Sequence, residues 1–167
     1  IFGVLARRLG RLVDAKETFG WAARSLQYRS AAYSRMAEIY LRETDHASAL
    51  QYARRAVEYD THNLDGLQAQ AIALRASGSR QAAEEVLKQI LSFDPLNHIA
   101  RFELHRLDPS EARLTDFRRM IRNEYPHETY MEMALYYLRL GLQDEAAALF
   151  LLAEPYPVAD YWLAYLL

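Results

Sequence analysis

Small residues recur along this chain at a fixed interval. Ala15, Ala49 and Ala83 are separated by 34 residues each, and every one opens an Ala-x-x-x series that continues with a second core-type residue. An interval of this length fits one pair of helices joined by a turn, repeated along the chain. Because one such pair cannot bury its apolar face alone, the interval predicts a stack of helical pairs.

The fullest form of the pattern lies near the carboxyl end of the chain, where large, small and glycine residues follow one another at fixed offsets. Its members are Tyr130, Met133, Ala134, Tyr137, Gly141, Ala146, Phe150 and Ala153. This series resembles the tetratricopeptide repeat. The resemblance implies that the first four members lie on a first helix, helix A. It places the glycine in or near the turn, and Ala146 and Phe150 on a second helix, helix B.

The resemblance extends over nearly the whole chain, with one irregular unit. Ala83 and Ala146 are 63 residues apart, so the repeat between them has lost about one helical turn. Its helix B is expected to end near Asn123, burying Leu114, Phe117, Met120 and Ile121. In the second repeat Thr44 replaces the turn glycine, and Asp45 is the expected N-cap.

We therefore expect an all-α, right-handed superhelix of about eleven antiparallel helices, in one domain covering residues 1–167. The resemblance divides this domain into units of unequal completeness. They are a partial repeat at 1–29, repeats at 30–63 and 64–97, an irregular repeat at 98–126, a repeat at 127–157, and the start of a further helix at 158–167.

Both ends suggest a longer parent protein. The opening run Ile1 to Ala6 already has the character of a helix interior, so we expect a fragment. The run Phe93 to Glu103 resembles, weakly, the repeat regions of large multidomain bacterial proteins. The helix at 158–167 has little polar surface beyond Asp160, so it should be covered by a continuation or allow self-association.

Composition excludes several classes of partner and chemistry. With 51% hydrophobic residues and a formal net charge of −2, the chain has no general attraction for nucleic acid or anionic membranes. Charges interrupt every apolar stretch before the ~18 residues that a membrane span needs. The absence of cysteine excludes disulfides and thiolate chemistry, and leaves a soluble cytoplasmic or periplasmic location open.

No hydrolase, phosphate-loop, metalloprotease or EF-hand motif is present, so we expect no enzyme, no cofactor and no metal site. His98 and His105 share a helix face but lie roughly 10 Å apart, too far for one metal ion. Adjacent acidic residues, such as Asp144 and Glu145, point to different sides of a helix. They are expected to be solvated charges at a helix start.

Glu128 and Glu132 are four residues apart on one expected helix. Like charges at this spacing repel each other by a few tenths of a kcal/mol, roughly, so another group should offset the repulsion. A basic neighbour such as Arg106 is the preferred explanation, and a cationic ligand is the alternative.

The family resemblance implies a ligand groove on the concave side, lined by the A helices. The expected groove residues are Arg35, Glu38, Arg42, Gln68, Ile72, Arg75, Phe102, Arg106, Met131 and Glu132. Arginine forks bind carboxylates, and Phe102 with Met131 could hold the apolar side chains of an extended acidic peptide. The alternative is that the arginines pair with Glu38, Glu103 and Glu132 and form a solvated face.

The first functional hypothesis is a protein-interaction scaffold that binds a protein or peptide in this groove. The second is a structural helical domain that packs on another domain of a larger, carbohydrate-handling bacterial protein. An open aromatic groove favours the first, whereas an apolar patch at an end or on the convex side favours the second. RNA binding is disfavoured by the low charge. A chaperone-tail receptor is disfavoured because Ser34, Glu38 and Arg42 do not match its carboxylate clamp.

Overall fold

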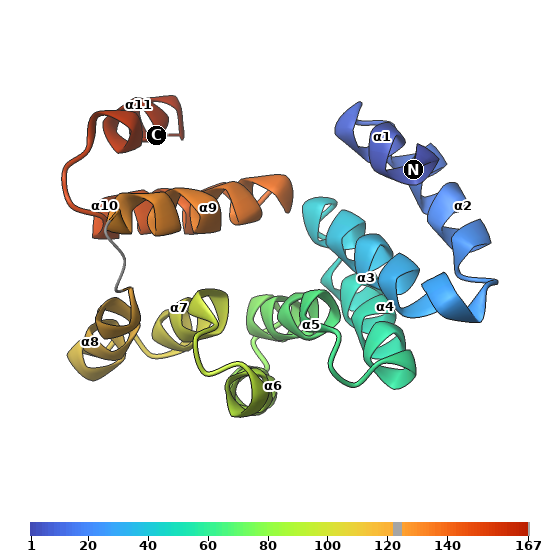
Figure 1. The fold of residues 1–167 in the computed structure, drawn as a ribbon, viewed down its shortest axis with the longest axis horizontal. Coiled ribbons are helices and arrows are strands. Elements are labelled where there is room, and N and C mark those ends of the chain that lie inside the picture. The colour runs from blue at the N-terminus through green and yellow to red at the C-terminus, as the bar shows by residue number, and fades with distance from the viewer. Residues whose placement is uncertain (122–124, 167) are drawn as a thin grey trace.

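The structure, a computed structural model, describes residues 1–121 and 125–166. Within these ranges every regular element is an α-helix, and successive helices pack as a stack of pairs (Figure 1). The expected all-α solenoid of about eleven helices is confirmed. The helices are α1 (Phe2–Arg8), α2 (Leu12–Ala22), α3 (Leu26–Arg42), α4 (His46–Tyr59), α5 (Leu64–Ala76), α6 (Arg80–Phe93), α7 (His98–Leu107), α8 (Glu111–Met120), α9 (Pro126–Arg139), α10 (Gln143–Leu152) and α11 (Pro157–Leu166).

The turns within the helical pairs use left-handed backbone conformations. Gly10, Gly78 and Gly141 have φ angles of 73°, 78° and 76°. Thr44 takes φ 58° between α3 and α4, so it does stand in the place of the turn glycine, at a cost of roughly 1–2 kcal/mol. Asp45 caps α4 as expected, because its side chain accepts a hydrogen bond from a backbone N–H of the first turn.

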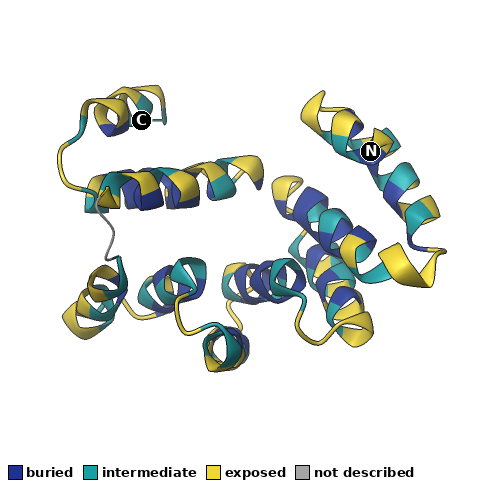
Figure 2. Ribbon diagram, in the orientation of Figure 1, coloured by how far each residue is buried: buried dark blue, intermediate teal, exposed yellow. Residues whose placement is uncertain are grey.

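Small residues lie where the helices cross. Ala15, Ala49, Ala83 and Ala146, which mark the repeat interval, have no exposed surface. Figure 2 shows buried residues along the faces that the helices turn toward their neighbours, with exposed residues on the opposite faces. Ala53, one turn after Ala49 on α4, is also fully buried. The spacing of alanines therefore reports close helix packing.

The fourth helical pair is short. Helices α7 and α8 have 10 residues each, against 13 and 14 in α5 and α6. Of the expected core residues, Phe117 is fully buried, while Leu114, Met120 and Ile121 are only partly buried. The expected helix end near Asn123 lies outside the described residues. Among consecutive helices in the described ranges, α8 and α9 approach each other least closely.

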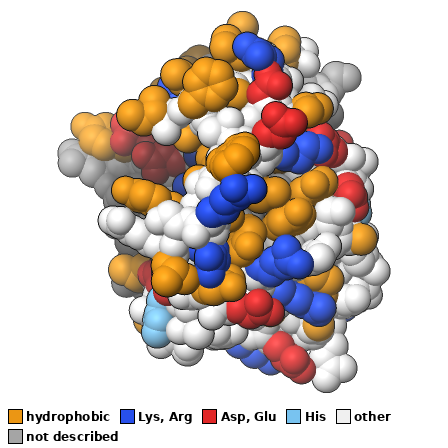
Figure 3. Space-filling model, turned by 90° about the vertical axis from the view of Figure 1, so that its right-hand side faces the viewer, with side chains coloured by type: hydrophobic (Ala, Val, Ile, Leu, Met, Phe, Trp, Pro, Cys, Tyr) orange, Lys and Arg blue, Asp and Glu red, His pale blue; other side chains and the backbone are white. Residues whose placement is uncertain are grey.

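Both ends of the stack expose large apolar side chains. Phe2 and Leu5 of α1 are exposed, as are Tyr161 and Tyr165 of α11. Figure 3 shows the face on the side of α1 to α4, where hydrophobic side chains mix with Lys and Arg. In the part of the chain that the structure describes, no helix combines the length and apolar character needed to cross a bilayer.

Replacing Ala49 or Ala53 by Leu should lower the free energy of unfolding by about 1–3 kcal/mol, because the larger side chain has no space at the helix crossing. Thermal unfolding followed by circular dichroism would measure the change. Ala47→Leu, on the exposed face of the same helix, is the matched control. Equal melting temperatures for all three variants would contradict the packing described here.

Candidate functional site

The concave side formed by the A helices α3, α5 and α7 is covered by another part of the chain. Helix α9 lies opposite α5 and α7 (Figure 1). The ring centroids of Phe102 in α7 and Tyr137 in α9 are 5.6 Å apart. At the end of α9, a Cβ added to Gly141 would lie 3.0 Å from Cγ of Arg42 in α3. The fifth repeat thus occupies much of the expected groove.

A buried ion-pair network joins the two sides of this groove. Arg75 Nε donates to Glu103 Oε2 at 2.5 Å, and Arg75 Nη2 donates to Glu145 Oε1 at 2.8 Å. Tyr137 donates its hydroxyl hydrogen to Glu103 Oε1 at 2.7 Å. Arg106 Nη2 lies 3.7 Å from Glu145 Oε1. The network connects α5, α7, α9 and α10, so it fixes the fifth repeat on the concave side.

The charge states of this network follow from its surroundings. Burial disfavours the charged form of Arg75, but the Glu103 and Glu145 carboxylates outweigh burial and raise the Arg75 pKa. Burial, together with the charge of Glu103, raises the pKa of Tyr137 well above its usual value. Tyr137 therefore remains a protonated hydrogen-bond donor, and Arg75 remains a cation between two carboxylates.

A second ion-pair cluster joins the first three repeats. Glu38 of α3 is buried and pairs with both Arg7 of α1 and Arg35 of α3. Arg35 Nη2 also lies 2.6 Å from Oδ2 of Asp65 in α5. Arg35 is consequently neutralised by carboxylates from two helices.

The ten expected groove residues do not form one open surface. Ile72 and Phe102 have no exposed surface, and Glu38 and Gln68 are buried. Arg35 and Arg75 are engaged in the ion pairs described above. Met131 is partly buried, and the remaining three are exposed. These three are Arg42, Arg106 and Glu132.

The alternative interpretation is that the groove arginines pair with neighbouring glutamates, and the structure contains some of these pairs. Glu38 and Glu103 each pair with an arginine, but within residues 1–121 and 125–166 no ion pair to Glu132 is found. The pairs are buried rather than solvated. Glu145 was expected to be a solvated charge, and this expectation is wrong because Glu145 is buried against Arg75. No local pattern marks Glu145 for this role, since its partner lies 70 residues away.

A small part of the concave side remains open beside α9. This concave cleft has a volume of about 300 Å³ and includes Gln68 and Glu132 from the expected set. Asp94 and His98 also line it, with Met133 among its apolar residues. The acidic and basic side chains that line the cleft are thus two carboxylates and one histidine, together with the phenol of Tyr136 and without an arginine.

The two histidines of α7 are partly buried. The Nδ1 atoms of His98 and His105 have no hydrogen-bond partner among the described residues. Burial lowers the pKa of both side chains, with a further contribution from Arg101 near His98 and from Arg106 near His105. No group of three or more His, Cys, Asp or Glu side chains suited to a metal ion occurs in the described ranges.

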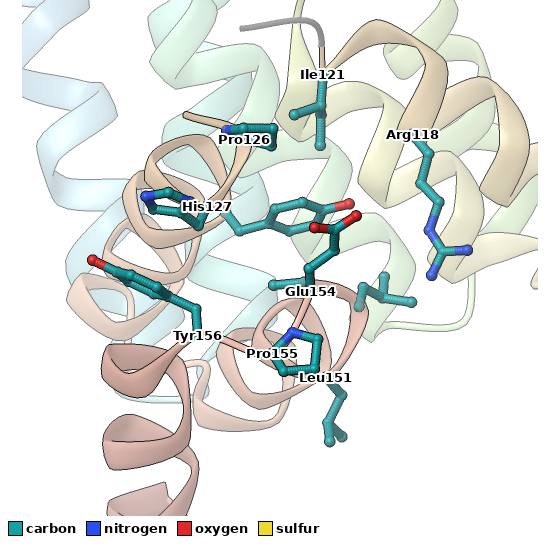
Figure 4. Close-up of a pocket in the computed structure, with 11 residues that line it drawn as sticks. Arg118, Ile121, Pro126, His127, Leu151, Glu154, Pro155 and Tyr156 are labelled. Atoms are coloured by element: carbon teal, nitrogen blue, oxygen red, sulfur yellow. The ribbon is translucent and has the colours of Figure 1, made fainter. Parts of the chain in front are cut away.

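Another hollow, of about 540 Å³, lies between the end of α8, the start of α9 and the segment after α10. Figure 4 shows Arg118 and Glu154 reaching its space from different elements, with no ion pair between them in the described chain. His127 and Tyr156 stack at its other side, with ring centroids 4.2 Å apart. The hollow therefore has one positive and one negative side chain, Arg118 and Glu154, and apolar walls that include Ile121.

Comparison with known protein families gives one match. Residues 30–63 match the family model described as Tetratricopeptide repeat. These are the bounds expected for the second repeat, and the segment contains most of α3 and all of α4. No curated protein matches the chain.

Replacing Arg75 by Met should lower the free energy of unfolding by about 3–5 kcal/mol, because Glu103 and Glu145 would remain buried without a counter-charge. Urea unfolding would measure this loss. Adding Glu103→Gln and Glu145→Gln should recover part of it. The control is Arg11→Met, whose exposed ion pair contributes about 0–1 kcal/mol. Equal losses for the two arginine variants would contradict the network.

Acidification should destabilise the protein partly through His98 and His105. Their pKa values are lower in the folded state, so the unfolded state binds more protons as the pH falls below about 6.5. Their stabilising contribution is present above that pH and is lost on acidification. When the pH is lowered from about 7.5 to about 5.5, the melting temperature of the double variant His98→Gln, His105→Gln should fall by less than that of the wild type. His62→Gln, at an exposed position, should behave as the wild type.

Proposed function

We propose that the chain belongs to the tetratricopeptide repeat family, because residues 30–63, its second repeat, match that family's model. From this premise we propose that it is a non-enzymatic scaffold that binds a partner protein or peptide at its concave side. The supporting observation is that this side already receives a helix, α9, through apolar contacts and a buried ion-pair network. Laying a helix into a groove is a common mode of protein recognition.

The partner contacts the accessible part of the concave side. The exposed Glu132 and the largely buried Gln68 both line the concave cleft beside α9, so they are the first contacts we assign. Arg42, Arg106 and Met131 are the other accessible members of the expected groove set. The less accessible members have a supporting role, since Arg75 pairs with Glu145 of α10, Phe102 packs on Tyr137 of α9, and Ile72 lies in the same apolar core.

The chemistry of the concave cleft favours a cationic or apolar side chain of the partner. Asp94 and Glu132 supply negative charge, and Met133 and Ile99 supply apolar surface. Arg35 and Arg75, which suggested an acidic partner, are already paired with carboxylates. An arginine or lysine of the partner would gain a charge-assisted hydrogen bond to Glu132.

The proposal is tested by reversing the charge of Glu132. Partners captured by the wild-type chain would be identified by mass spectrometry, purified, and titrated by calorimetry. Glu132→Arg should weaken the dissociation constant by roughly tenfold, the equivalent of about 1.4 kcal/mol. Glu58→Arg, an exposed position on α4, makes the same charge change away from the cleft and should bind as the wild type. Equal binding by both variants would contradict the assigned contact, and the absence of any partner would contradict the scaffold.

A second candidate function is structural. In this role the chain packs against another domain, such as a domain of a carbohydrate-handling protein, or against a second copy of itself. The supporting observation is the exposed apolar surface at both ends, including Leu9 in the turn after α1 and Val158 on α11. Such surface is costly to leave in water. A partner that both Glu132→Arg and Glu58→Arg retain, but that Tyr161→Ser with Tyr165→Ser loses, would favour this function.

A further inference from the structure

A second cleft lies on α2, α3 and α4 and shares no lining residue with the concave cleft. This outer cleft has a volume of about 510 Å³. Figure 3 shows the side of the molecule that carries these helices, with Lys and Arg side chains among hydrophobic ones. None of the residues that line the cleft is acidic. The residues that matter for its chemistry are Arg24, Arg29, Arg55, Tyr33, Tyr52 and Tyr59.

The three arginines of the outer cleft are held without carboxylates. In the described ranges none of them forms an ion pair, in contrast to Arg35 and Arg75 of the concave side. Arg29 donates to the backbone carbonyl oxygens of residues 23 and 24, at 2.7 and 3.2 Å. The Arg24 guanidinium lies 3.8 Å from the Trp21 ring centroid. Their positive charge is therefore available to a ligand.

Aromatic rings orient the guanidinium groups. Arg55 lies 5.9 Å from the ring centroid of Tyr33 and 5.7 Å from that of Tyr52. Arg29 lies 4.8 Å from the ring centroid of Tyr59. Such contacts hold the planar guanidinium while leaving edge N–H donors free for a carboxylate. Tyrosine hydroxyl groups add further donors at the same cleft.

We propose that this arginine–tyrosine cleft binds an acidic segment of a partner protein. Aspartate or glutamate side chains of the segment receive hydrogen bonds from Arg24 and Arg55, and an apolar side chain contacts Met36. Charge complementarity carries the proposal, because the lining has three arginines and no carboxylate. The site is separate from the concave cleft, so the proposal goes beyond the function assigned there.

The aromatic geometry favours a peptide over single-stranded nucleic acid. Binding of bases requires free aromatic faces on which they stack. In the outer cleft the tyrosine rings already contact guanidinium groups and one another. The ring centroid of Tyr33 lies 5.9 Å from that of Tyr52 and 6.0 Å from that of Tyr59. The available groups are hydrogen-bond donors, which suit carboxylates.

The test is fluorescence anisotropy of the whole chain with a fluorescein-labelled peptide that alternates Asp and Leu. Arg55→Glu should weaken binding by about tenfold or more, because it places a like charge in the cleft. Arg54→Glu is the matched control, since Arg54 is the exposed neighbour on α4 and does not line the cleft. Arg24→Glu is a second variant in the cleft, at an arginine whose guanidinium stacks on the ring of Trp21. Melting temperatures verify that each variant folds.

The outcomes separate this proposal from its alternatives. Weaker binding for Arg55→Glu and Arg24→Glu, with wild-type affinity for Arg54→Glu, would support it. Equal weakening by Arg54→Glu, or no binding of the acidic peptide to the wild type, would overturn it. Tighter binding of oligodeoxythymidine than of the peptide, lost in Arg55→Glu, would overturn it in favour of nucleic acid. The outer cleft and the concave cleft share no lining residue, so failure of the concave proposal would not affect this one.

Discussion

The position of the fifth repeat depends on the contacts of one guanidinium group. Arg75 on α5 pairs with Glu103 on α7 and Glu145 on α10, and Tyr137 on α9 completes the hydrogen bonding of Glu103. A buried charge without its partner is strongly destabilising, whereas apolar contacts alone tolerate several arrangements. The network therefore selects the one placement of α9 and α10 in which both carboxylates meet Arg75.

This placement determines which surfaces a partner can reach. With α9 on the concave side, the accessible remainder is a cleft that contains Asp94 and Glu132. The outer cleft on α2 to α4 instead contains three arginines that form no ion pair with any residue the structure describes. A formal net charge of −2 conceals this separation, because the opposite charges lie in different clefts. Local charge is therefore a better guide to partners of this molecule than net charge.

The sequence predicted the helices better than the surfaces. Helix pairs, turns and the cap at Asp45 depend on residues close in the chain, so the 34-residue interval is sufficient to locate them. Burial in the groove depends on the angle between repeats, which no local pattern specifies. Ile72 and Phe102 match a groove position in the repeat and yet lie in the core. The partner of Glu145 could be found only after α10 was placed against α5.

Two local signals together explain why the last repeat turns inward. The fourth repeat is about a turn short, so α8 offers α9 little surface in the ordinary stacking direction. Helix α10 is apolar on more than one face, since Ala147 and Leu149 are buried as well as Ala146 and Phe150. A helix that is apolar all round must be covered on more than one side. In this chain α9 and α11 pack against α10, and its first turn reaches Arg75 on the concave side.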